Sequence, residues 1–187
     1  MRNDFPWYDS FWLNIYVRVK KYLSENYPER LQEFIDSFAP LRTNKSFKTR
    51  YFQDLLGSEV LQEVRNIIRE LNTTELEKQE FINFGRMVVH NHPYFTSLQN
   101  NLLDRVTDAT GELVEHYYNF LSLYHNLGVC PVHLDAPLAK WTLDICIDQS
   151  HPWPIYLSET IPWPEDFIIT DTDWQRQIKN DPQHQFT

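Results

Sequence analysis

The stretch YHNLGVCPVHLDAPLAKWTLDICID, residues 124–148, combines short apolar runs with turn residues and with a closely spaced histidine and aspartate. Residues 129–135 and 140–148 are each short and apolar, which is typical of β-strands. Side chains alternate across a strand, so we expect His133 and Asp135 to project from one face. An imidazole and a carboxylate on one rigid face supply two of the donors that a metal site needs.

Other segments after Gly111 also favour strands. Residues 113–124 are rich in β-branched and aromatic types, and residues 153–158 predict a further strand that Pro154 places at an edge or at a strand start. Strands joined by turns in this order predict an antiparallel β-sandwich or barrel.

Residues before Gly111 predict helices, because their apolar side chains recur at helical spacing. The expected helices cover residues 9–25, a segment opened by Pro28, a segment that begins at Ser58, a segment from Thr73 or Thr74 to about Phe81, and residues 95–109. We therefore predict a single α+β domain over residues 1–187. Its mainly helical layer, residues 1–111, would pack on a β core that residues 112–187 begin.

The composition excludes several classes of protein. The net charge of -9 argues against binding to the phosphate backbone of nucleic acids, which needs clustered lysine and arginine. No apolar run approaches a membrane span, and the residues after Met1 do not have the pattern of a signal peptide. Two cysteines are too few for a disulfide scaffold, so we expect a cytoplasmic protein.

The stretch around the histidine and the aspartate resembles the first metal motif of the Fe(II)/2-oxoglutarate-dependent oxygenases. A wider run, from NFLSLY to YLSE, is similar to a group of bacterial, notably cyanobacterial, proteins near that superfamily. The resemblance covers about residues 80–187, and the residues that carry it are Tyr124, Gly128, His133, Asp135 and the segment Lys140-Trp141-Thr142-Leu143. It implies N-terminal helices packed on a double-stranded β-helix, or jelly roll, which this chain would fill only in part.

The resemblance also implies two cofactors, Fe(II) and 2-oxoglutarate, for the hydroxylation of an unidentified small-molecule or peptide substrate. His133 and Asp135 match the first two iron ligands. Tyr124 matches a tyrosine that binds 2-oxoglutarate in some members, although a core aromatic would look the same. Lys140 matches a lysine that pairs with the distal carboxylate of 2-oxoglutarate, although a solvated lysine at the start of a strand would look the same.

The third iron ligand is the point at which the chain departs from this family. His184 stands 49 residues after Asp135, an acceptable separation, but it lies in a polar segment with no basic residue after it. Two explanations stay open: the chain ends before the second metal histidine, or it is a relative that keeps the scaffold without a complete iron site. The end of the sequence favours the first, and we expect an incomplete barrel, or one whose edge is covered by another segment or subunit.

Other residues are weaker candidates for a site. His90 and His92 could share a metal if their segment is a strand, Asn119 and Ser122 flank Tyr124, and Trp153 and Trp163 could form a stacking platform. The alternative function is a non-catalytic, cupin-like protein that binds a small ligand or a peptide, or serves as a scaffold. The oligomeric state is open.

Overall fold

The chain divides into two compact units whose segments alternate along the sequence. The computed structural model describes residues 8–44, 46–130, 133, 135, 138–157 and 184–186, with side chains from Ile15 to Leu157. The first unit consists of residues 1–49, 132–142 and 153–187, and the second consists of residues 50–131 and 143–152. Each unit is described separately below.

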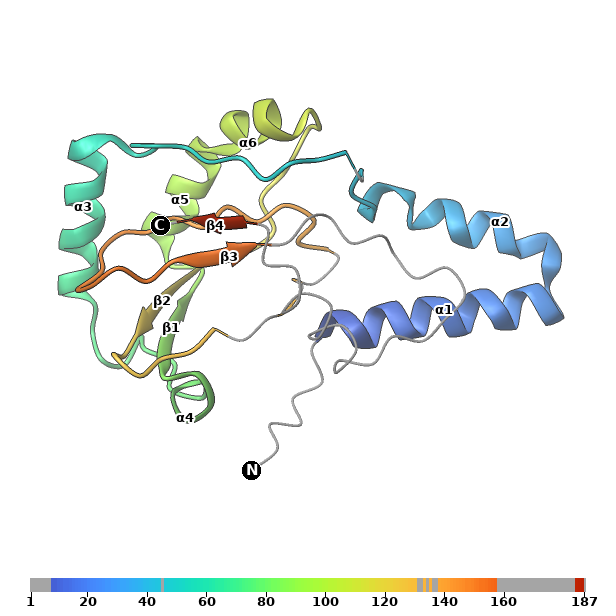
Figure 1. Cartoon of the computed structure of the whole chain (residues 1–187), viewed down its shortest axis with the longest axis horizontal. Coiled ribbons are helices and arrows are strands. Elements are labelled where there is room, and N and C mark those ends of the chain that lie inside the picture. Colours follow the sequence, from blue (N-terminus) through green and yellow to red (C-terminus); the bar gives the residue numbers. More distant parts are fainter. Residues whose placement is uncertain are drawn as a thin grey trace. The chain divides into compact units, whose positions relative to one another are not determined.

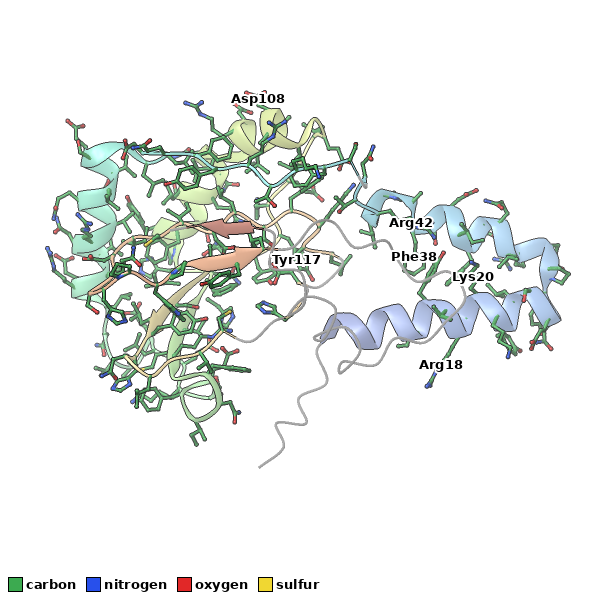
Figure 2. The ribbon with its side chains drawn as sticks, viewed as in Figure 1. Arg18, Lys20, Phe38, Arg42, Asp108 and Tyr117 are labelled. Carbon is green, nitrogen blue, oxygen red and sulfur yellow. The ribbon has the colours of Figure 1, made fainter. Side chains whose placement is uncertain are left out.

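Two helices form a hairpin in the first unit (Figure 1): α1 (Tyr8–Asn26) and α2 (Pro28–Ser37). Tyr16 on α1 is only 1% exposed, and its ring centroid lies 5.5 Å from that of Phe34 and 5.1 Å from that of Phe38. Arg42 follows the short 3-10 helix η1 (Ala39–Leu41) and donates a hydrogen bond to the Tyr16 hydroxyl. Figure 2 shows Phe38 and Arg42 at the C-terminal end of α2. The hairpin thus has an aromatic core of its own.

The first unit also contains a short antiparallel ladder. β3 (Ile155–Leu157) pairs with β4 (His184–Phe186), so that Ile155 faces Phe186 and Leu157 faces His184. The predicted strand over residues 153–158 is therefore present in part, since Trp153 and Pro154 precede the ladder and Ser158 lies outside the described residues.

The second unit is built around another antiparallel ladder. β1 (Arg86–His90) pairs with β2 (Phe120–Tyr124), with Arg86 opposite Tyr124 and His90 opposite Phe120. The backbone of Glu77 bridges Val88 at the other edge of β1. Val88 is 2% exposed and Val89 is 4% exposed. Because neighbouring residues point to opposite faces of a strand, both faces of β1 are covered.

Four helices accompany this ladder: α3 (Gly57–Glu70), α4 (Phe81–Phe84), α5 (Pro93–Asn101) and α6 (Leu103–Thr110). α3 buries Val64, and its Arg65 donates a hydrogen bond of 3.2 Å to the carbonyl of Ile147. Gly85 ends α4 and Gly111 ends α6, each in the left-handed conformation that glycine adopts without a steric penalty. No helix in the described part of the chain is long and apolar enough to span a bilayer.

The prediction of a double-stranded β-helix, or jelly roll, is wrong. The described residues are mainly helical, and their strands form only two separate two-stranded ladders. Residues 113–119 and the described parts of 129–135 and 140–148 lie outside any ladder. A strand needs a ladder of hydrogen bonds to a neighbour as well as a suitable pattern of side chains, and among the described residues no ladder includes these segments. The alternative function was described as cupin-like, and a cupin is also a jelly roll. That part of the alternative is therefore wrong for the same reason.

The helix predictions are mostly confirmed. The predicted segments at residues 9–25, Pro28 and Ser58 correspond to α1, α2 and α3. The predicted helix from Thr73 or Thr74 to Phe81 is wrong, because Glu77 pairs with β1 and a helix begins only at Phe81. The predicted helix over residues 95–109 is two helices, α5 and α6, that meet at Leu102.

Candidate functional site

His133 and Asp135 lie side by side in the first unit. The Nε2 atom of His133 is 3.4 Å from Oδ1 of Asp135, and the two side chains are 36% and 38% exposed. Neither residue is part of a strand, so the expectation that strand alternation places them on one face is not the reason for their proximity. The two donor groups nevertheless meet as the sequence predicted.

The carboxylate of Asp135 has a second partner seven residues further on. The Oγ1 hydroxyl of Thr142 donates a hydrogen bond to Oδ2 of Asp135, while Oδ1 faces the imidazole. Hydrogen bonds from an outer shell of residues commonly orient metal-binding carboxylates. Thr142 therefore selects which carboxylate oxygen faces His133.

The residues just before Thr142 fasten this segment to the region that follows α2. Lys140 Nζ donates a hydrogen bond of 2.9 Å to the carbonyl of Pro40 and lies 5.4 Å from the centre of the Trp141 ring. The Trp141 ring in turn lies 4.6 Å from that of Phe47. Lys140 thus has structural partners, and its role towards 2-oxoglutarate stays a prediction.

A third metal ligand does not appear among the described side chains. No group of three or more histidine, cysteine, aspartate or glutamate side chains that could hold a metal is found in that part of the chain. The backbone of His184 opens β4, in the same compact unit as His133 and Asp135. Its role as the third ligand stays a prediction.

Tyr124 belongs to the second unit, where it ends β2 beside Arg86. Nη1 of Arg86 donates hydrogen bonds to the Tyr124 hydroxyl, at 2.9 Å, and to Oγ of Ser122, at 3.4 Å, while its Nε atom pairs with Glu80. The guanidinium also lies 5.6 Å from the ring centres of both Phe84 and Tyr124. The structure thus brings Tyr124 together with Arg86, and places it in a different unit from His133.

The environment of Tyr124 changes its acidity. Burial, with a smaller contribution from the Cys130 thiol beside it, raises the pKa of the Tyr124 phenol to about 12, although Arg86 acts in the opposite direction. The hydroxyl therefore stays protonated over the physiological pH range. It can donate a hydrogen bond, as a tyrosine that binds 2-oxoglutarate would have to do.

The other candidates have local partners. His90 Nδ1 lies 2.9 Å from a carboxylate oxygen of Glu77, whereas His92 Nε2 lies 4.0 Å from one of Glu75. These two imidazoles thus pair with different carboxylates. The Nδ2 atom of Asn119 donates hydrogen bonds to side chains of α5.

The remaining candidates are exposed or fall outside the described residues. Trp153 is 46% exposed, and Trp163 falls in a segment that the structure does not describe. Cys130 and Cys146 are exposed and form no disulfide. A hollow of about 390 Å³ lies in the second unit, lined by residues of α3 and α5 that include Val60, Glu63 and Tyr94. None of the predicted site residues lines it.

Sequence reasoning assigned no role to Thr142 and did not identify Arg86. Thr142 lies within the motif that carries the resemblance, but a spacing of seven residues in an irregular segment does not predict a hydrogen bond. The signal for Arg86 was stronger. Pairing RMVVH with FLSLY as antiparallel strands places Arg86 opposite Tyr124.

No protein-family model matches this chain, and no curated protein or solved structure matches it either.

Proposed function

We propose that this chain is an Fe(II)- and 2-oxoglutarate-dependent oxygenase in which His133 and Asp135 are two of the iron ligands. One observation carries the proposal: the 3.4 Å distance between Nε2 of His133 and Oδ1 of Asp135. The described residues contain no jelly roll, so the proposal depends on this donor pair and not on that fold.

The geometry of the pair suits two adjacent ligands of one ion. Each donor in an octahedral site lies about 2.1 Å from the metal, and adjacent donors subtend a right angle, so they stand roughly 3 Å apart. The observed separation is 3.4 Å, and a small side-chain rotation would bring the two atoms to that spacing. One imidazole and one carboxylate are also two of the three protein ligands of non-haem Fe(II) oxygenases.

In this proposal the protein residues hold the metal and orient its ligands, while the iron, when bound, would activate dioxygen. His133 and Asp135 bind the metal, and Thr142 fixes the orientation of the carboxylate. Lys140 remains the residue proposed for 2-oxoglutarate, and His184 remains the residue proposed as the third ligand. Tyr124 belongs to the other compact unit, and its role towards 2-oxoglutarate stays an expectation from the resemblance.

The proposal extends to the substrate class and the location. A net charge of -9 disfavours nucleic acids, so a small molecule or a peptide is the proposed substrate. A cytoplasmic location is proposed because the reducing conditions there suit ferrous iron and two cysteines that form no disulfide.

The test measures metal binding and turnover with a matched histidine control. The full chain and the variants His133→Ala and Asp135→Asn are titrated with Mn(II), a stable substitute for Fe(II). They are then loaded with Fe(II) under argon and assayed in air for succinate formed from 2-oxoglutarate. Because loss of an outer-shell partner costs 10–100-fold in affinity, loss of a ligand should cost more than about 100-fold.

His90→Ala is the control, because His90 also pairs with a carboxylate, at 2.9 Å, and has a similar exposure of 42%. It should bind Mn(II) and form succinate like the unmodified chain. Equal affinity of the His133→Ala and His90→Ala variants would contradict the proposed iron site. Metal binding that depends on His133 without any succinate would favour the non-catalytic binding protein.

A further inference from the structure

The hydroxyl of Thr142 contacts one oxygen of Asp135, and the imidazole of His133 faces the other. The hydrogen bond goes to Oδ2, and Nε2 of His133 lies 3.4 Å from Oδ1. Thr142 itself is exposed, and its hydrogen bond to Asp135 is the contact that gives it a direct relation to the proposed site. Oδ2 of Asp135 therefore accepts the hydrogen bond from Thr142, while Oδ1 faces His133.

The position of Thr142 is fixed by its two predecessors in the chain. Lys140 reaches the carbonyl of Pro40 in η1, at 2.9 Å, and Trp141 packs on Phe47, with 4.6 Å between ring centroids. Both contacts lie within the first unit, as does Asp135. The segment after α2 therefore holds the hydroxyl at the carboxylate.

An exposed aspartate without such a partner samples several rotamers, and ordering the side chain on metal binding costs conformational entropy. A hydrogen bond already present before binding removes part of that cost, since the acceptor oxygen is held in one orientation. The effect requires only the hydroxyl, which serine also provides and valine lacks.

We propose that Thr142 is a positioning residue for the metal, acting through Asp135. This inference rests on the proposed function, because it assumes that Asp135 binds a divalent metal ion. It adds a residue from outside the histidine–aspartate motif, and it gives the Lys140-Trp141 segment a role in keeping that residue in place.

The test compares Thr142→Val and Thr142→Ser in the full chain. Mn(II) affinity is measured by calorimetry, and thermal unfolding is followed by circular dichroism. Thr142→Val should weaken Mn(II) binding by about 10–100-fold, as expected for loss of an outer-shell hydrogen bond, with an unchanged melting temperature. Thr142→Ser should bind like the unmodified chain. The control Thr110→Val removes a hydroxyl that donates to the Val106 carbonyl in the other unit, and should leave affinity unchanged.

The possible results separate this inference from the proposed function. If Thr142→Val binds Mn(II) normally while His133→Ala does not, Thr142 has no positioning role and the iron site stands. An equal loss of affinity in Thr142→Ser and Thr142→Val would also overturn the role of the hydroxyl. Failure of the unmodified chain to bind Mn(II) would overturn both. If valine lowers the melting temperature, Thr142→Ala replaces it in the same comparison.

Discussion

Arg86 and Tyr124 form a half-buried polar cluster in the second unit. The Arg86 guanidinium donates hydrogen bonds to the Tyr124 hydroxyl, to Ser122 and to Glu80, and it lies against aromatic rings. A charged group that is taken out of water needs such partners, because an unpaired buried charge is costly. The cluster therefore fixes the end of the β1–β2 ladder.

The raised pKa of Tyr124 leads to a prediction about pH. A folded-state pKa of about 12, above the ordinary 10.0, means that the folded protein holds this proton more tightly than the unfolded chain. The stabilisation is fully present below pH 10 and is lost as the pH rises towards 12. The free energy of unfolding, measured with urea, should fall more steeply between pH 10 and 12 in the unmodified chain than in Tyr124→Phe.

The same comparison can be made by spectroscopy. Nine other tyrosines titrate as well, since the chain has ten, so the ultraviolet titration of Tyr124→Phe is subtracted from that of the unmodified chain. The difference should report a phenol that ionises near pH 12. A difference curve centred at pH 10 would contradict the effect of burial on this residue.

At the scale of elements, a glycine pair joins α4 and β1 to the turn after β2. Gly85 has φ +64°, and a Cβ atom there would lie 2.8 Å from Cα of Gly128. The carbonyl of Gly85 also accepts a hydrogen bond of 2.8 Å from the backbone of His125. The two backbones approach so closely that neither glycine has room for a side chain.

We predict that Gly85→Ala lowers the free energy of unfolding by more than about 2 kcal/mol. The left-handed backbone alone costs alanine roughly 1–2 kcal/mol, and the contact with Gly128 adds to this. Gly57→Ala is the matched control, because Gly57 has φ +68° but a Cβ atom there would meet nothing within 4 Å. Gly57→Ala should lower the free energy of unfolding only by the cost of the left-handed backbone. Equal losses in urea denaturation would show that the glycine contact is not tight.

The helices were the elements that the sequence predicted best. α1 and α2 have apolar residues at helical spacing, and Pro28 marks the start of α2, so local signals suffice. The helix expected from Thr73 or Thr74 was wrong because Glu77 finds a partner in Val88. Pairing with a strand eleven residues away is a tertiary effect that a local pattern does not report.

The strand predictions over residues 113–124 and 153–158 are confirmed in part by β2 and β3, whereas the prediction over residues 140–148 failed for a specific reason. Leu143, Ile145 and Ile147 are half-buried, whereas Asp144, Cys146 and Asp148 between them are exposed. This is the alternation typical of a strand with one covered side, although the strand over residues 140–148 was predicted from its short apolar run. The segment has no ladder partner among the described residues, and a short apolar run does not report that.

At the scale of the whole molecule, the stretch from Tyr124 to Asp148 crosses between the two compact units. Tyr124 lies in the second unit, His133 to Thr142 lie in the first, and residues 143–152 return to the second. His133 and Asp135 lie close together, with 3.4 Å between Nε2 and Oδ1, but not for the predicted reason, because neither residue belongs to a strand. The sequence did not predict Thr142 as a partner, since that contact depends on how the segment is held to the region after α2.

The most direct test of the iron site is the position of a bound metal. Crystals of the full chain grown with Mn(II) and measured near its absorption edge should show an anomalous peak about 2.0–2.2 Å from both Nε2 of His133 and Oδ1 of Asp135, the usual distance for such ligands. A well-ordered pair with no peak between its donors, or a peak bound only elsewhere on the protein, would contradict the account.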